Sequence, residues 1–295
     1  MTVLTGDDTA AHTEFVRKLR DSMDSGTCFQ LVGLSGQGAA ANADDDRAHA
    51  EPAPNAAGPD DGGITIAVGL KAANSAMEGP GQGPLLLAML SRIDYESLKG
   101  SGALRHPERP VGVLLRDPAM ADQVALIDAI LPRKHRLGVV ATTESEPIVR
   151  ELQRAAPGWD LQIEYAPDAK SLASVLRMLV ARSDALLVLP DMIGDDQAAT
   201  LAVLSAGASA GLPVFGSSDG LVRSGGLAAA VSTPDQLARQ ACELARKLAA
   251  NDAAGSVTVE AATPATVRVN PTVARALGLR LSDERELTAR VTAIR

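Results

Sequence analysis

Aromatic side chains are scarce in this chain: its 295 residues include three phenylalanines, two tyrosines and one tryptophan. A binding site built on ring stacking is therefore disfavoured. Alanine, glycine, leucine and valine dominate instead, and 46% of the residues are hydrophobic. This composition is typical of an α/β protein whose helices pack closely on sheets. The length is enough for one large core or two ordinary ones.

Basic residues are outnumbered by acidic ones, 28 against 36, which gives a net charge of −8. Nucleic acid is excluded as a partner because no basic face would neutralise its phosphates. No apolar run reaches the length of a membrane span. A signal peptide is also missing, since Met1 leads into a predicted strand within two residues. The protein is therefore either cytoplasmic, or its sequence begins at the boundary of a mature exported form.

The side chains that most often bind metals are few and scattered. Cys28 and Cys242 form neither a metal-ligand spacing nor a CxxC motif. We interpret them as two small buried hydrophobic residues, and a disulfide between them stays open if the protein is exported. The four histidines show no HxH or HxxxH spacing. We expect no metal and no cofactor.

The glycine-rich and serine motifs of common enzymes are also missing. Residues 33–38 follow a predicted strand, but their glycines have the order GxxGxG, whereas a dinucleotide site needs GxGxxG at the start of a helix. No GxxxxGK[ST] phosphate loop is present. Residues 216–219 read GSSD and lack the GxSxG pattern of a nucleophilic serine. We therefore predict no catalytic residues and no enzymatic activity.

The segment from Ser183 to Ala230 contains the clearest strand and helix patterns of the chain. Ala185 to Leu189 is a short, wholly apolar run, which favours a strand buried on both faces of a parallel sheet. Gln197 to Ala210 follows with apolar residues at helical spacing. Pro213 to Gly216 is the next apolar strand. Strand, helix and strand with short joins form a βαβ unit, whose ligands lie beyond the carboxyl ends of the strands.

The same alternation predicts two comparable βα domains, with further elements near the C-terminus. Residues 92–109 are expected to be irregular. The segment from Gly36 to Gly63 has no large apolar residue and is expected to be a mobile loop. Predicted strands lie at residues 2–5, 29–34, 64–70, 84–90 and 110–115 in the first domain, and at 137–141, 161–165, 185–189, 213–216 and 227–231 after it.

Short polar residues recur where the predicted strands end. Each one alone is more typical of a helix cap or a turn, but together they occupy one edge of both sheets. Hydroxyls, carboxylates and a guanidinium without a paired nucleophile and base describe a binding cleft better than a catalytic one. The candidate ligand-binding residues are Ser35, Gly69, Lys71, Ser91, Arg92, Asp117, Thr142, Asp191, Ser217, Ser218 and Asp219.

Several segments, in their order along the chain, resemble one known family. They are ITIAVGLKAANSA from residue 64, VALIDAILPRKHRLGVV from 124, DALLVLPD from 184, AGLPVFGSSDGLVRSGGLAAAVSTPDQLARQA from 210 and TVRVNPTVARALGLRLSDE from 266. The chain is similar over nearly its whole length to ABC-transporter substrate-binding proteins of the tryptophan/tyrosine-binding type. The resemblance implies the type I periplasmic-binding fold, in which two Rossmann-like α/β lobes are joined by a hinge of three crossings.

The resemblance also implies how the chain is divided and what it does. The crossings are expected near Arg116, Gly225 and Ala262, so lobe one comprises 1–116 plus 226–261 and lobe two comprises 117–225 plus 262–295. Such a protein binds a small molecule, here an amino acid or a related compound, between its lobes and delivers it to a transporter permease in the membrane. It would be periplasmic, or exported and membrane-tethered, with its signal segment outside this sequence.

An amino-acid ligand would need partners for both of its charges. Ser35, Ser91 and Arg92 are the expected donors to its carboxylate, and Asp191 or Asp219 is the expected acceptor for its ammonium. The chain departs from its relatives at residues 70–71, where Leu70 and Lys71 replace a small hydroxyl residue, and in the length of the 36–63 segment. Together with the scarcity of aromatic residues, these departures favour a ligand other than an aromatic amino acid.

Two other functions remain open at this stage. A two-domain Rossmann-like enzyme, such as a nucleotide-sugar glycosyltransferase, would need a phosphate-binding glycine turn at a helix start and a positioned base, and neither is visible. A periplasmic sensory module would share the receptor fold but would signal to a membrane partner.

Overall fold

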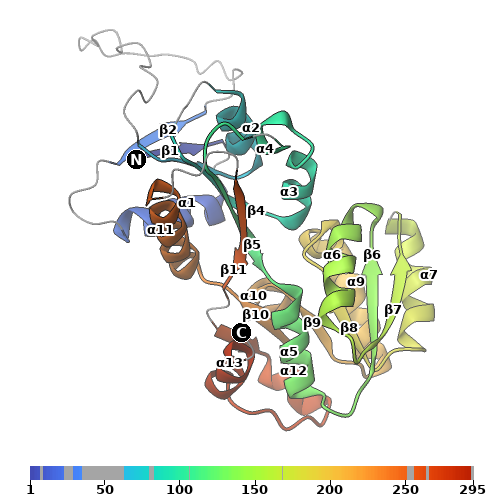
Figure 1. Ribbon diagram of the computed structural model, residues 1–295. Helices are drawn as coiled ribbons and strands as arrows, with labels where there is room; N and C mark the ends of the chain where they lie inside the picture. The colour runs from blue at the N-terminus through green and yellow to red at the C-terminus, as the bar shows by residue number, and fades with distance from the viewer. Residues whose placement is uncertain are drawn as a thin grey trace, which may run out of the picture.

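The chain folds into two α/β lobes, each built on a six-stranded sheet with helices on both faces (Figure 1). The computed structural model describes residues 1–6, 9–22, 29–34, 63–79, 83–105, 107–167, 169–250, 256–263 and 266–293. Two separate sheets confirm the predicted fold class of two Rossmann-like lobes.

The sheet of the first lobe is parallel throughout, and its strands follow the order β11-β5-β4-β3-β1-β2. One face is covered by α1 (Ala10–Asp21) and α11 (Pro234–Ala250), and the other by α2 (Leu70–Glu78), α3 (Arg92–Leu98) and α4 (Gly102–Arg105). The strands are β1 (Thr2–Thr5), β2 (Gln30–Gly33), β3 (Thr65–Val68), β4 (Leu85–Leu90), β5 (Val111–Pro118) and β11 (Val257–Ala262).

The sheet of the second lobe repeats this order as β12-β10-β9-β8-β6-β7, with β12 antiparallel to β10. Its strands are β6 (Arg136–Ala141), β7 (Asp160–Tyr165), β8 (Ala185–Val188), β9 (Val214–Gly216), β10 (Ala228–Val231) and β12 (Thr266–Val269). One face is covered by α5 (Met120–Ile130), α6 (Glu146–Ala155), α12 (Pro271–Ala276) and α13 (Glu284–Thr292). The other face packs against α7 (Ala169–Val180), α8 (Met192–Asp195), α9 (Gln197–Ala210) and α10 (Asp219–Arg223).

The apolar patterning explains which strands lie at the centre of each sheet. Every residue of β4 and β8 is buried, as predicted for strands that have helices on both faces. The edge strands β2 and β7 carry polar residues and are partly exposed. Burial of the central strands makes the two sheets the cores around which the lobes form.

The second crossing differs from the one expected near Gly225. β10 pairs with β9 on one side and with β12 on the other, so residues 228–231 belong to the second sheet. The chain therefore returns to the first lobe after Val231, where α11 begins at Pro234. β10 continues the parallel pairing of β9, which places the turn at Gly225 inside the second lobe.

Residues 92–98 and 102–105 are helical, so the expected irregular segment is wrong there. Ser91 and Asp94 form a capping box: the Ser91 hydroxyl accepts from the Asp94 N–H at 3.0 Å, and the Asp94 carboxylate accepts from the Ser91 N–H at 2.9 Å. This pair satisfies two N–H groups that a helix start leaves without partners, and α3 follows from it. The S-x-x-D spacing was the available signal in the sequence.

Some predicted features lie outside the described residues, namely Cys28, Ser35 and the greater part of the 36–63 segment. Cys242 is half-buried against the core of the first lobe. Within the described ranges, no helix combines the length and the apolar character that crossing a bilayer requires.

Gly69 joins β3 to α2 in a conformation that suits glycine. Its φ is 82°, which L side chains rarely adopt, and an added Cβ would lie 2.7 Å from Cε1 of His12. Its N–H donates to the Ala88 carbonyl at 2.9 Å. Gly69 is thus buried, and its backbone conformation explains why a glycine follows β3 without any role in ligand binding.

We expect Gly69→Ala to lower the free energy of unfolding by about 1–3 kcal/mol, because the new methyl group meets both the unfavourable φ and the His12 ring. Urea denaturation measures the change. The control is Gly102→Ala at the start of α4, where an added Cβ meets no atom within 4 Å. Equal midpoints for the two variants would contradict this account.

Candidate functional site

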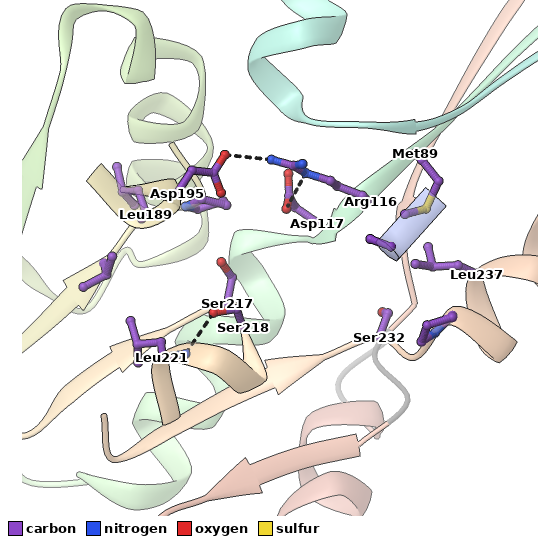
Figure 2. A pocket seen from close by; sticks show the side chains of 15 residues that line it. Met89, Arg116, Asp117, Leu189, Asp195, Ser217, Ser218, Leu221, Ser232 and Leu237 are labelled. Atoms are coloured by element: carbon purple, nitrogen blue, oxygen red, sulfur yellow. Dashed lines mark hydrogen bonds and ion pairs between the residues drawn. The ribbon is translucent and has the colours of Figure 1, made fainter. Parts of the chain in front are cut away.

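A cavity of about 290 Å³ lies between the two lobes (Figure 2). It is bordered by the carboxyl ends of β4 and β5 from the first sheet and of β8, β9 and β10 from the second, which is where parallel sheets place their ligands. Met89 and Leu237 lie on one side in Figure 2, Leu189 and Asp195 lie on the other, and Arg116 lies between them. Its walls therefore come from both lobes.

Met89 reaches the cavity through an irregularity of its strand. Its φ is 60°, and the register of β4 against β5 shifts between Ala88 and Leu90, which marks a bulge at Met89. A bulge turns a side chain away from the regular alternation of the strand. A non-glycine residue with this backbone is strained, and such strain gathers at functional sites. The sequence of β4 gives no sign of it.

An ion pair joins the lobes beside the cavity. The Arg116 guanidinium, on β5 of the first sheet, lies 2.9 Å from the carboxylate of Asp195, on α8 of the second lobe. The same guanidinium lies 3.7 Å from the Asp117 carboxylate. Figure 2 shows the three side chains together, with Arg116 extended towards Asp195. Two carboxylates therefore share a single cation at this end of the cavity.

Asp117 is the most perturbed of these groups. Burial raises the pKa of its carboxyl group to about 7, an effect that the Arg116 charge opposes and the Asp195 charge reinforces. Its side chain is 16% exposed, and its Oδ2 has no hydrogen-bond partner among the described residues. Asp117 is thus a buried carboxyl group that can change its charge near neutral pH.

Three serines complete the polar lining. Ser218 caps α10 by accepting from the Leu221 N–H at 3.1 Å. Ser232 donates to the Thr263 carbonyl and so links the second and third crossings. Ser217 is half-buried and lines the cavity, and its hydroxyl forms no hydrogen bond to the described part of the chain. Its hydroxyl is therefore available to a ligand.

The cavity brings together three of the predicted ligand-binding residues, Asp117, Ser217 and Ser218. Asp191 and Thr142 lie elsewhere, in a buried network. Asp191 is 1% exposed, and its carboxylate accepts from the N–H groups of Ile193 at 2.9 Å and Gly194 at 3.2 Å and from the Ser145 hydroxyl. Thr142 is hydrogen-bonded to the same hydroxyl at 2.8 Å. Asp191 therefore caps α8 and in this way positions Asp195.

The expected carboxylate donors of the first lobe are already engaged. The Ser91 hydroxyl belongs to the capping box of α3. The Arg92 guanidinium lies 2.8 Å from the carboxylate of Glu151 on α6, which forms a second ion pair between the lobes. Glu151 also accepts from the Met120 N–H at 3.0 Å. Neither Ser91 nor Arg92 lines the cavity.

Lys71 and Asp219 also lie away from the cavity lining. Lys71 is exposed on α2. Asp219 forms ion pairs with Arg223 at 3.1 Å and with Arg268 at 3.7 Å on the surface of the second lobe. Exposed pairs of this kind contribute little to stability.

Sequence reasoning missed Met89, Arg116 and Asp195. Arg116 was taken only as a lobe boundary, and Asp195 lies on the four-residue helix α8, which was not predicted. Asp191 carried the available signal, because an aspartate directly after a buried strand is a preferred helix cap. Among the residues that the structure describes, no group of histidine, cysteine and acidic side chains is arranged to hold a metal.

Comparisons with known proteins agree with this geometry. The family model for ABC transporter substrate binding proteins matches residues 104–292. None of the curated proteins compared matches the chain. The solved structures that resemble it include CD0873, a substrate binding protein with adhesive properties from Clostridium difficile, in its ligand-free, open form. That structure has a TM-score of 0.67 and 17% identity, and the alignment covers 96% of each chain.

A second solved structure is an ABC domain in complex with L-Trp from Streptococcus pneumoniae, with a TM-score of 0.59 and 17% identity over 96% of this chain and 95% of that one. A third is a conserved domain protein from Vibrio cholerae, with a TM-score of 0.60 and 19% identity over 98% and 97%. At these identities the likeness shows the fold. The predicted type I periplasmic-binding fold is confirmed.

The raised pKa of Asp117 makes a prediction about stability. Because the folded-state pKa of about 7 lies above the unfolded value, the protonated carboxyl contributes stability that is complete below pH 4 and is lost as the pH rises through 7. Between pH 5 and 8 the loss is on the order of 2 kcal/mol.

We expect Asp117→Asn to remove this part of the pH dependence, so that the variant gains stability relative to the unsubstituted protein as the pH rises. Urea denaturation at a series of pH values measures the effect. Asp160→Asn, at an exposed position on the edge strand β7, is the matched control. Parallel pH profiles for the Asp117 variant and the unsubstituted protein would show that the carboxyl is not perturbed.

Proposed function

Because the chain belongs to the family of ABC transporter substrate binding proteins, we propose that it is the solute-binding component of an ABC importer and binds a small molecule in the cavity between its lobes. The observation that supports this most directly is the composition of the cavity wall, which takes Met89 and Arg116 from the first sheet and Asp195 and Ser217 from the second lobe. The closed form is favoured because a ligand contacts both lobes only there.

The path of the chain is suited to such closure. Three segments connect the sheets: the end of β5, the residues between β10 and α11, and the residues between β11 and β12. Rotation of one lobe against the other requires backbone changes in these segments alone. Ser232 and the Thr263 carbonyl couple two of them. In this proposal the segments act as the hinge.

The ligand in this proposal is an amino acid or a related compound. Asp117 would accept from its ammonium group, and the hydroxyls of Ser217 and Ser218 would add hydrogen bonds. Met89 and Leu237 would contact its apolar part. The lining combines mostly apolar side chains with a few polar groups, which is typical of a binding pocket.

The wider role follows from the family. Substrate-binding proteins of ABC transporters generally act outside the cytoplasm and do not transform what they bind. We propose that this protein is periplasmic, or exported and tethered to the membrane, and that it delivers its ligand to a permease.

A substitution that fills the cavity tests the proposal. We expect freshly purified protein to carry a small molecule, or to be stabilised by one in a thermal-shift screen of amino acids, amines, sugars and nucleotides. Ser217→Phe should weaken its binding at least about tenfold, a loss of about 1.4 kcal/mol, because the ring occupies the ligand's space. Native mass spectrometry and calorimetry measure occupancy and affinity.

Ser209→Phe is the control, since Ser209 is exposed on α9 outside the cavity lining. Circular dichroism establishes that both variants are folded. The proposed function is wrong if no small molecule co-purifies and none in the screen raises the melting temperature, or if Ser217→Phe binds the ligand as tightly as the control.

A further inference from the structure

The charged groups at the cavity are unbalanced. Among its described lining residues, Asp117 and Asp195 are acidic and Arg116 alone is basic, so with both carboxylates ionised the cavity has a net charge of −1. Arg116 lies 2.9 Å from one carboxylate and 3.7 Å from the other. One oxygen of Asp117 has no hydrogen-bond partner among the described residues. A second cation would balance this charge.

An anionic group would find no equivalent partner. Arg116 is shared by two carboxylates, and Arg92 is paired with Glu151 at 2.8 Å. A ligand carboxylate bound to Arg116 would lie beside Asp117 and Asp195, which already share this guanidinium. Like charges at such distances are costly in a partly desolvated site.

Apart from the charged groups and the three serines, the cavity lining is mostly aliphatic. Met89, Leu189, Leu221 and Leu237 line it, and its described lining includes no aromatic residue. The volume of about 290 Å³ lies at the lower end of the range for ligand pockets. The shape and chemistry suit a small molecule with a cationic head and a compact apolar body.

We propose that the cavity binds an aliphatic ammonium compound without a carboxylate, in preference to a zwitterionic amino acid. This inference rests on the proposed function and narrows its ligand class. The ammonium group would donate to Asp117 and to the free Ser217 hydroxyl, and the aliphatic chain would lie against Met89 and Leu237.

Binding of a cation beside Asp117 has a consequence that a neutral or anionic ligand would not share. The groups that face this carboxyl are Arg116 on β5, Asp195 on α8, and Asp94 and the Arg92 N–H on α3, and with burial they place its pKa at about 7. An ammonium ligand favours the ionised carboxylate and releases a proton. Its affinity therefore rises about tenfold between pH 6 and pH 8.

Matched ligands distinguish the charge of the head group from the shape of the chain. Each triad shares one side chain and comprises an amine, the corresponding amino acid and the corresponding acid. The triads are butylamine, norvaline and pentanoate; 3-methylbutylamine, leucine and 4-methylpentanoate; and 3-(methylthio)propylamine, methionine and 4-(methylthio)butanoate. Titration calorimetry at pH 6 and pH 8, in buffers of different ionisation enthalpy, measures both affinity and proton release.

We expect the amine of at least one triad to bind about tenfold or more tightly than its amino acid, and the acid to bind least. Asp117→Asn should weaken binding of the amine about tenfold at pH 8 and abolish its pH dependence, because the cation loses its ionised partner. Asp160→Asn, exposed on β7, should leave both unchanged. This control separates the local partner from the overall charge of the protein.

The inference is overturned if an amino acid or an acid binds at least as tightly as its amine in every triad, if none of the nine compounds binds, or if Asp117→Asn leaves amine affinity unchanged. None of these outcomes contradicts the proposed function if some other solute binds in the cavity and Ser217→Phe loses that binding. Loss of all solute binding in the earlier screen would instead remove the proposed function itself.

Discussion

The ion pair between Arg116 and Asp195 joins the two lobes and orders the charged groups beside the cavity. It connects a strand of the first sheet to a short helix of the second lobe, beside the cavity that both lobes line. The pair is partly exposed, so its contribution to stability is modest, and its importance lies in geometry. It keeps Arg116 close to Asp117, and Asp117 is the carboxyl whose pKa is most strongly raised by its surroundings.

The geometry of this pair is itself supported by buried polar contacts. Asp191 accepts from two N–H groups at the start of α8 and from the Ser145 hydroxyl, which fixes the helix that carries Asp195. Helix α8 has four residues, and Asp191 caps its N-terminus. A second contact between the lobes, Arg92 with Glu151, joins α3 to α6 at 2.8 Å. Residues predicted as ligand contacts thus serve to hold the walls of the cavity.

The sequence was sufficient for the fold because its signals are local. Apolar runs such as Ala185 to Leu189 and the spacing along Gln197 to Ala210 report burial directly, and short joins then determine the pairing. The site was predicted only in part. Strand ends identify Asp117, Ser217 and Ser218, but the same pattern applies equally to Ser91 and Asp191, whose side chains are used within the protein. Which polar groups remain available to a ligand depends on contacts between segments that are distant in sequence. The position of Met89 in the cavity wall depends on a β-bulge, which the sequence of the strand does not indicate.

The order of the strands also bears on how the protein is made. The first sheet needs β11, which ends at Ala262, and the second needs β12, which ends at Val269, so neither lobe is a continuous piece of chain. During synthesis the first sheet lacks an edge strand until β11 has emerged, and the second until β12 has emerged. Pairings over such long separations form slowly. Each sheet is therefore completed only after strands of the other sheet have been synthesised.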